Sequence, residues 1–327
     1  MLDIKELEKV LASEPTYRLC QAKQALFQDL VAGWETVTAL PAALRAELTK
    51  ACPLAISHQL STSADGQTTK CLITLDDGEQ IEAVLMRHDD RRTVCVSQQV
   101  GCALGCRFCL TGQMGFRRNL SVSEIVAQVL VFARREKVTN IVFMGMGEPL
   151  LNYDNVLAAI RILNDPDGFN MGARRISIST VGIVPGIRRL AEENLQVNLA
   201  VSLHAPNDKL RSELLPVNGK YPLAAVLRAV DDYIKKTNRR VMVEYLLLAG
   251  INDSASCAQE LATLLSGRLC FVNLISYNVT AAQFKPSPPE KVRRFKKTLE
   301  GRGLTVTQRY RFGRNIKAAC GQLGTGA

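Results

Sequence analysis

The sequence predicts an α/β protein whose core is an open partial (β/α)6 barrel. Three observations lead to this fold class. Six apolar segments recur along the chain, amphipathic segments of helical periodicity separate them, and chemically distinctive residues follow the apolar segments. Strands that alternate with helices form parallel sheets. Because six strands are fewer than the eight that close a full barrel, we expect the sheet to stay open.

The predicted strands and helices alternate from residue 93 onward. The strands cover residues 93–97, 140–145, 175–180, 197–203, 241–248 and 270–276. The helices cover residues 121–136, 153–163, 185–194, 222–236 and 254–266. In sheets of this kind, ligands bind at the carboxyl ends of the strands. The stretch GCALGCRFC follows the first strand, and GMGEP, SIST, SLH and SYN close or follow later ones, so we expect the site at this edge.

The rest of the chain divides into flanking parts. Residues 1–60 carry apolar side chains at helical spacing and are predicted to form a small helical accessory domain, which we expect to bind RNA. Residues 61–92 contain the alternating segments KCLITL and IEAVLM around the turn DDGEQ, which predicts a linking β-hairpin. Residues 93–284 form the predicted barrel core, and residues 285–327 form a basic carboxy-terminal extension.

The composition is that of an ordinary globular protein. The chain has 327 residues, of which 47% are hydrophobic and 22% are charged, and it begins without an apolar signal-peptide run. No apolar segment is long enough to predict a transmembrane helix. We therefore expect a cytoplasmic protein with no membrane partner, whose ten cysteines do not form structural disulfides. We also expect a monomer.

The excess positive charge lies near the end of the chain. The formal net charge is +10, and the segment from Lys285 to Lys317 holds eleven Lys or Arg residues against two acidic ones. Clustered basic residues neutralise nucleic-acid phosphates, so we expect RNA contact here, with a solvated helix face as the alternative. The interleaved Phe295, Tyr310 and Phe312 could stack on bases or pack internally.

Three cysteines lie close together at Cys102, Cys106 and Cys109. A structural zinc site takes four ligands, usually from two separated cysteine pairs, and no histidine lies within ten residues of this cluster. Three thiolates on one loop can instead hold three corners of a 4Fe-4S cube and leave the fourth iron open. The spacing favours this cluster over zinc and over a site without metal.

The spacing C-x3-C-x2-C, with Phe108 before the last cysteine, resembles the signature of the radical S-adenosylmethionine (SAM) enzymes. The resemblance implies that SAM binds the open iron of a 4Fe-4S cluster through its amino and carboxylate groups. It implies that an electron from the cluster splits SAM into methionine and a 5'-deoxyadenosyl radical. It also implies that GMGEP binds the SAM amino group through Gly147 and Glu148. A simple glycine-rich turn is the alternative for that motif.

Longer stretches resemble one family within these enzymes. The segments VGCALGCRFCLTGQMGFRRNLSVSEIVAQV, FMGMGEPLLNYDNV, VNLAVSLHAPNDKLRSELLPVN and AACGQL are similar to the RlmN-type methyltransferases, and the resemblance covers about residues 15–323. It implies methylation of carbon 2 of one adenosine in 23S rRNA and, in dual-specificity members, of an adenosine in tRNA. It further implies two SAM molecules per turnover and an electron donor such as flavodoxin or ferredoxin.

The resemblance also implies roles for three residues outside the cluster. Cys320 in AACGQL matches the cysteine that carries the methyl group, and Cys95 matches the cysteine that releases the product by forming a disulfide with it. Glu82 matches a glutamate proposed as the base that takes the adenine proton. From the residues alone, Cys95 would be a buried strand residue and Glu82 would lie on the solvent face of its strand.

The resemblance carries the family's SAM-binding residues onto four segments of this chain. They are Gly147, Glu148, Ser179, Ser202, Leu203, His204 and Asn278. One departure from the family lies before AACGQL, where acidic residues are usual and this chain has Asn315 and Lys317. That departure leaves the choice between rRNA and tRNA undecided.

Two alternative functions are also compatible with these motifs. The Cfr type uses the same set of cysteines to methylate carbon 8 of the same rRNA adenosine, which confers antibiotic resistance. GEP and GFRRNL in this chain favour carbon 2. A noncatalytic RNA-binding relative would keep the iron–sulfur cluster for structure alone, but it would need neither Cys95 nor Cys320.

Overall fold

One mixed sheet forms the centre of the protein. The computed structural model describes residues 2–280, 283–309 and 313–324. Within these residues, ten strands join in the order β1-β2-β3-β4-β7-β8-β9-β10-β11-β12. The first three pairings are antiparallel, and those from β4 to β12 are parallel. The strands are β1 (His58–Thr62), β2 (Thr68–Thr74), β3 (Gln80–His88), β4 (Arg91–Cys95), β7 (Asn140–Phe143), β8 (Ile176–Thr180), β9 (Asn198–Ser202), β10 (Val241–Leu247), β11 (Cys270–Ser276) and β12 (Val306–Gln308).

The open partial barrel predicted from the sequence is confirmed. All six predicted strands are present as β4 and β7 to β11, and the predicted hairpin is β2 and β3. The structure adds a further short parallel strand, β12, which pairs with β11. This strand lies in the segment predicted as the basic extension. A separate two-stranded sheet, β5 (Gln99–Gly101) with β6 (Phe116–Asn119), flanks the cysteine-rich loop.

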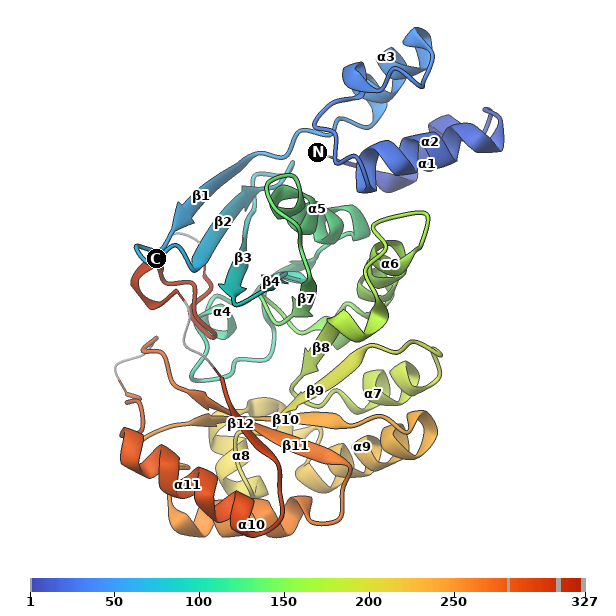
Figure 1. Ribbon diagram of the computed structural model, residues 1–327. Helices are drawn as coiled ribbons and strands as arrows, with labels where there is room; N and C mark the ends of the chain where they lie inside the picture. The colour runs from blue at the N-terminus through green and yellow to red at the C-terminus, as the bar shows by residue number, and fades with distance from the viewer. Residues whose placement is uncertain (1, 281–282, 310–312, 325–327) are drawn as a thin grey trace.

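Helices cover the outer face of the parallel strands (Figure 1). The five predicted helices are α5 (Val122–Ala133), α6 (Tyr153–Asn164), α7 (Val184–Ala191), α9 (Leu223–Thr237) and α10 (Ala255–Leu265); the others in this part are α4 (Leu110–Gln113), α8 (Asp208–Leu214) and α11 (Pro289–Gly301). Phe295 of α11 is buried and packs against Tyr245, with ring centroids 5.1 Å apart. Phe295 therefore packs internally, whereas Tyr310 and Phe312 lie outside the described residues.

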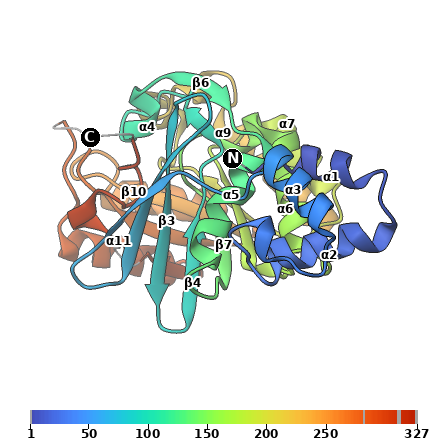
Figure 2. The same cartoon turned by 90° about the horizontal axis from the view of Figure 1, so that it is seen from above.

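Three short helices at the amino terminus pack beside the barrel. They are α1 (Ile4–Leu11), α2 (Thr16–Phe27) and α3 (Ala42–Ala51), and Figure 2 shows them on the opposite side of the molecule from α11. Trp34 fills their core and donates a hydrogen bond to Cys52 O at 2.7 Å. The Ile4 amide bonds Ser123 Oγ of α5 at 3.0 Å. Across the described ranges, we find no helix with the length and apolar character needed to span a membrane.

Two buried side chains fix the loops at the carboxyl ends of β8 and β9. Arg211 of α8 donates to Val181 O, to Asn218 Oδ1 at 2.7 Å and to Tyr221 O at 3.2 Å. Burial lowers the pKa of Arg211 to about 10. His204 follows β9 with a left-handed φ of 59°, and its Nδ1 accepts the Leu246 amide hydrogen bond at 3.0 Å. These contacts tie neighbouring loops together at the edge where the site was expected.

The first prediction concerns Arg211. Arg211→Met should lower the free energy of unfolding by about 2–4 kcal/mol, because it leaves several buried acceptors without a donor. Denaturant unfolding measures the change. Arg228→Met on the exposed face of α9 is the matched control and should stay within about 0.5 kcal/mol of the wild type. An equally small effect of Arg211→Met would contradict the structural role given to this side chain.

The second prediction concerns acid stability. Burial lowers the pKa of His204 from 6.5 to about 3, and the nearby Arg211 adds to this. Between these two values the unfolded chain binds a proton that the folded chain does not, so the free energy of unfolding falls as the pH falls. His204→Asn, which tolerates the left-handed backbone, should lose less stability than the wild type over this range. Unfolding curves of both proteins at several pH values test this, and parallel losses would contradict it.

Candidate active site

The cysteine-rich loop is anchored on several sides. Cys102 and Cys106 are buried and Cys109 is half-buried. The Cys102 amide bonds Gly115 O at 2.8 Å, and the Arg107 amide bonds Leu214 O of α8 at 3.1 Å. Thr280, after β11, donates to Phe108 O at 2.8 Å. The backbone is therefore held in place before any ligand binds.

The burial of the three thiols suits a cationic centre that would bind them as thiolates. Burial raises the pKa of Cys102 to about 12 and also raises the pKa of Cys106 and Cys109. Buried thiols of this kind are protonated at neutral pH unless a cationic centre binds them. Within the described residues, no three His, Cys, Asp or Glu side chains converge on one ion. A 4Fe-4S cube binds each thiolate at a different iron, so its ligands do not have to converge.

A cavity, here called the cluster cavity, opens beside this loop at the carboxyl ends of the strands. Nine of the residues predicted from the sequence line it: Cys102, Cys106, Cys109, Gly147, Glu148, Ser179, Ser202, His204 and Cys320. Phe108 also lines it and meets the His204 ring edge to face, with centroids 5.0 Å apart. The structure thus brings residues from five separate loops around one space.

Glu148 is buried and already has hydrogen-bond donors. One carboxylate oxygen accepts from the Leu150 amide and the other from the Val181 amide, both at 3.0 Å. Burial raises the pKa of Glu148 to about 7. A ligand ammonium beside Glu148 would share these oxygens and favour the charged carboxylate. The side chain therefore both joins the ends of β7 and β8 and faces the cluster cavity.

The glycines of GMGEP are required by the protein's own backbone. A Cβ at Gly145 would lie 2.6 Å from Val96 O. Gly147 has a φ of +94°, and a Cβ there would lie 2.5 Å from the Gln99 side chain. Both glycines line the cluster cavity as well. Close packing of the first two barrel loops is enough to explain why these positions lack side chains.

Glu244 was not predicted from the sequence, although it joins the two predicted serines. It is buried on β10, where its Oε2 accepts from Ser179 Oγ at 3.0 Å and from Ser202 Oγ at 3.4 Å. Its Oε1 has no hydrogen-bond donor among the described residues, and Arg309 Nη1 lies 3.5 Å away. The signal was present in VMVEYLLL, where Glu244 is the one charged residue of an apolar strand.

A second cavity, here called the Cys95 cavity, adjoins the first. Cys95, Asn278 and Ser276 line it, and Cys109, Arg309 and Cys320 belong to both cavities. The Asn278 Oδ1 and Ser276 Oγ atoms are buried without a hydrogen-bond partner in the part of the chain that the structure describes. Such unpaired acceptors fit a polar ligand. Cys320 and Arg309 therefore stand where the two cavities meet.

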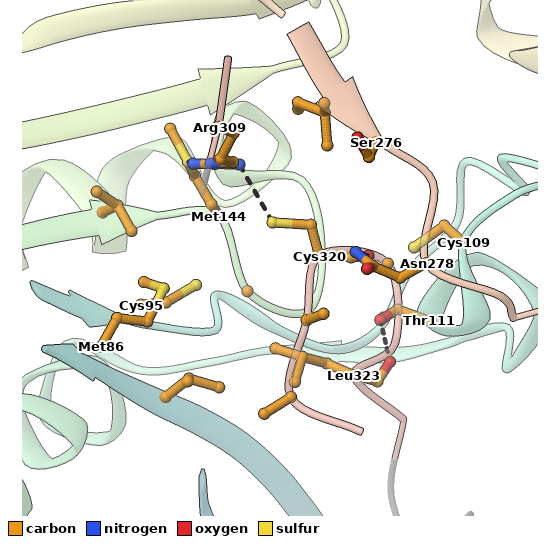
Figure 3. Close-up of a pocket in the computed structure, with 17 residues that line it drawn as sticks. Met86, Cys95, Cys109, Thr111, Met144, Ser276, Asn278, Arg309, Cys320 and Leu323 are labelled. Carbon is orange, nitrogen blue, oxygen red and sulfur yellow. Dashed lines mark hydrogen bonds between the residues drawn. The ribbon is translucent and has the colours of Figure 1, made fainter. Parts of the chain in front are cut away.

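Residues 318–324, here called the C-terminal strap, carry Cys320 into this position (Figure 3). The Leu110 amide bonds Gly321 O at 2.9 Å, and Thr111 Oγ donates to Leu323 O at 2.5 Å. Cys320 is exposed, whereas burial raises the pKa of Cys95 to about 12, with a smaller contribution from the neighbouring Cys320. The two thiols outside the cluster thus lie in contrasting environments around one cavity.

Arg309 is the second residue that the sequence reasoning missed. Its Nη1 donates to Cys320 Sγ at 3.1 Å, and its Nη2 lies 2.8 Å from Met144 Sδ. Figure 3 shows the Cys320 sulfur turned toward this guanidinium. From the sequence, Arg309 is one of the basic residues expected to contact RNA. Its place depends on β12, which was not predicted.

Two predicted residues line neither cavity. Leu203 is fully buried. Glu82 is also buried, with Oε1 2.8 Å from Lys70 Nζ and Oε2 accepting the Gly324 amide hydrogen bond at 2.7 Å. The alternative that placed Glu82 on a solvent face is therefore wrong, because Lys70 and the strap cover it.

The disulfide implied between Cys95 and Cys320 is not formed. The described residues include all ten cysteines, and each is a free thiol. The Cys320 sulfur instead accepts the Arg309 hydrogen bond. The disulfide is thus no part of this conformation.

Comparison with known proteins gives consistent matches. Residues 96–257 match the radical SAM superfamily. The chain is 45% identical to a probable dual-specificity RNA methyltransferase RlmN of Dictyoglomus thermophilum, over 98% of this chain and 94% of that relative. It is also 45% identical to the ribosomal RNA large subunit methyltransferase N of Nitrosopumilus maritimus, over 98% of this chain and 96% of that relative.

A solved structure matches the whole fold. It is the crystal structure of a radical SAM methyltransferase from Sphaerobacter thermophilus, whose sequence is 49% identical to this chain. The two structures superpose with a TM-score of 0.95 over 98% of this chain and 97% of that one. Radical SAM enzymes use a 4Fe-4S cluster and SAM, which agrees with the three thiols of the cluster cavity. The chain belongs to the RlmN family of radical SAM methyltransferases.

Proposed function

We propose that this enzyme methylates carbon 2 of an adenosine in 23S rRNA, and of an adenosine in tRNA, through a methylated cysteine. The observation that carries the proposal is the place of Cys320, which lies between the cluster cavity and the cavity lined by Cys95. A noncatalytic RNA-binding protein would have no use for two free thiols there. The names of the relatives, one of them described as dual-specific, support RNA as the substrate.

The cofactors supply chemistry that the side chains lack. When bound, the 4Fe-4S cluster and two molecules of SAM provide a methyl group, an electron and the 5'-deoxyadenosyl radical. Cys102, Cys106 and Cys109 would hold the cluster, and a flavodoxin or ferredoxin would reduce it. Glu148, Ser179 and Ser202 would orient SAM beside it, since they line the same cavity. Leu203 could contribute only its backbone, because its side chain is buried.

The two thiols outside the cluster would act in sequence. Cys320 is exposed and would accept the methyl group as a thiolate. The buried Cys95 would later attack the Cys320 sulfur, and the transient disulfide would release the RNA. Because burial raises the pKa of Cys95 to about 12, this thiol stays protonated and unreactive until a base or a change in the strap activates it. The difference in exposure and protonation between the two thiols would make methylation of Cys320 precede the attack by Cys95.

Glu82 would serve as the base for the adenine proton only after the strap moves. Both of its carboxylate oxygens are taken, one by Lys70 and one by the Gly324 amide. Release of Gly324 frees one oxygen. The availability of the base would therefore depend on the position of the strap that carries Cys320.

The RNA surface would include α11. Lys291, Arg293, Arg294 and Lys297 are exposed on this helix, so they can contact phosphates. Residues 1–60 hold six Lys or Arg against seven acidic residues. If this accessory domain binds RNA, it would do so by shape rather than by charge. Asn315 and Lys317, beside the strap, would influence the choice between rRNA and tRNA. We also infer action as a monomer in the cytoplasm.

The third prediction tests the reaction and its substrate. Nucleosides from purified 23S rRNA and tRNA are analysed by mass spectrometry after reaction with the reconstituted enzyme, SAM and a reductant. We expect 2-methyladenosine in both RNAs. Its appearance in rRNA alone would restrict the substrate, 8-methyladenosine would favour the Cfr type, and no methylation of either RNA would contradict the proposal.

The fourth prediction separates the roles of the two thiols. Cys320→Ala should abolish methylation without joining protein to RNA, because the methyl carrier is absent. Cys95→Ala should instead accumulate a covalent protein–RNA complex that migrates slowly on a denaturing gel. Cys270→Ala, a buried thiol outside both cavities, is the control and should do neither. Full activity of Cys320→Ala would refute the covalent route.

A further inference from the structure

We propose that Arg309 positions the Cys320 sulfur for methyl transfer and that Glu244 holds Arg309 in place. This inference rests on the proposed role of Cys320 as methyl acceptor. Arg309 Nη1 lies 3.1 Å from Cys320 Sγ and 3.5 Å from Glu244 Oε1. The strap and β10 therefore both meet the Arg309 guanidinium.

Arg309 is fixed to the sheet, whereas Cys320 belongs to the strap. The Arg309 amide bonds Leu274 O at 2.9 Å, directly after β12. β12 pairs with β11, so this backbone position is part of the barrel. The strap is held to the barrel by separate hydrogen bonds to Leu110 and Thr111. The contact between Arg309 and Cys320 thus joins the strap to the barrel at the reacting atom.

Glu244 connects this contact with the cluster cavity. Its Oε2 accepts from Ser179 and Ser202, while its Oε1 faces Arg309. The Glu244 side chain is 5% exposed and the Arg309 side chain is 24% exposed. A charge pair at this depth keeps more of its strength than a pair in water. The serines orient the carboxylate, and the carboxylate orients the guanidinium.

The chemistry of methyl transfer suits a guanidinium at this point. Cys320 is exposed, so its thiol first loses its proton to solvent water, because the thiolate is the nucleophile. The thiolate then forms a bond to the methyl carbon, the bond from that carbon to the SAM sulfur breaks, and the electron pair stays on SAM as S-adenosylhomocysteine. Arg309 donates a charge-assisted hydrogen bond to the reacting sulfur and so holds it in place. The methylated sulfur is a neutral thioether and a weak acceptor, so the contact loosens once the step is complete.

The contact also shows in the electrostatics of the arginine. Cys320 is the largest influence that raises the pKa of Arg309 above its usual range, followed among the charges by Glu244. Arg309 therefore stays charged. Since its charge is directed to Cys320 and Glu244 inside the cavities, Arg309 is a positioning residue rather than part of the phosphate-binding surface.

The fifth prediction measures the reactivity of Cys320 without RNA or SAM. Full-length protein with its iron–sulfur cluster is treated anaerobically with iodoacetamide, and the rate of alkylation of unmethylated Cys320 is followed by peptide mass spectrometry. Cys20, exposed on α2, serves as the reference thiol in the same molecule. Arg309→Met should lower the ratio of the Cys320 rate to the Cys20 rate roughly ten-fold, as expected when a charged hydrogen-bond donor is lost.

Companion variants separate positioning from folding. Arg309→Lys keeps the charge but loses the planar fork, so it should restore part of the ratio. Glu244→Gln should give an intermediate ratio, because it weakens the hold on Arg309. Arg161→Met removes an arginine paired with Glu193 at the surface and should match the wild type. If Arg309→Met folds poorly, the comparison of Arg309→Lys with the wild type still decides.

The inference would be overturned if Arg309→Met and Arg309→Lys alkylated Cys320 as fast as the wild type or faster. The fraction of Cys320 that carries a methyl group after incubation with SAM gives a second measure and should fall in the same order. The alkylation rates do not depend on RNA methylation. A wild-type enzyme that shows the predicted rates and methylates no RNA would contradict the proposed function and leave the contact intact.

Discussion

The docking of the C-terminal strap is the interaction on which the rest of the site depends. Hydrogen bonds from Leu110 and Thr111 hold the strap backbone, and Glu82 holds its far end through Gly324. Without them Cys320 would have no fixed relation to the barrel. Because the strap bonds to α4 directly after Cys109, the loop that would hold the cluster also places Cys320, the proposed methyl acceptor. The strap thus fixes the position of Cys320 relative to the cysteine-rich loop.

Much of the fold and of the cysteine-rich loop could be predicted from the sequence. The six buried strands are apolar runs separated by amphipathic helices, so local pattern was enough to find them. β12 is only three residues long and lies among basic residues, so no local pattern distinguished it. The places of Arg309 and Glu244 depend on pairing across the sheet. Such long-range register is a property of the folded chain rather than of any short segment.

Glu82 is a further residue whose surroundings the local sequence pattern could not predict. Its strand alternates, and alternation correctly predicts a strand but leaves open which face is covered. In the sheet, Leu72 of β2 pairs with Glu82, which puts Lys70 at a diagonal position within reach of the carboxylate. The strap then covers the remaining side. A charged side chain could be buried here because a strand neighbour and a segment 242 residues away each supply a donor.

The distribution of charge follows from this architecture. The sequence alone does not distinguish the basic residues near the carboxyl end from one another, but the fold places them in two different environments. Arg309 turns into the cavities, while the basic residues of α11 stay on the outer surface. Residues 1–60 carry slightly more acidic than basic residues, and their three helices lie on the other side of the barrel in both views (Figures 1 and 2). The positive charge on the side of the molecule that carries α11 would attract phosphates, which supports the RNA surface proposed there.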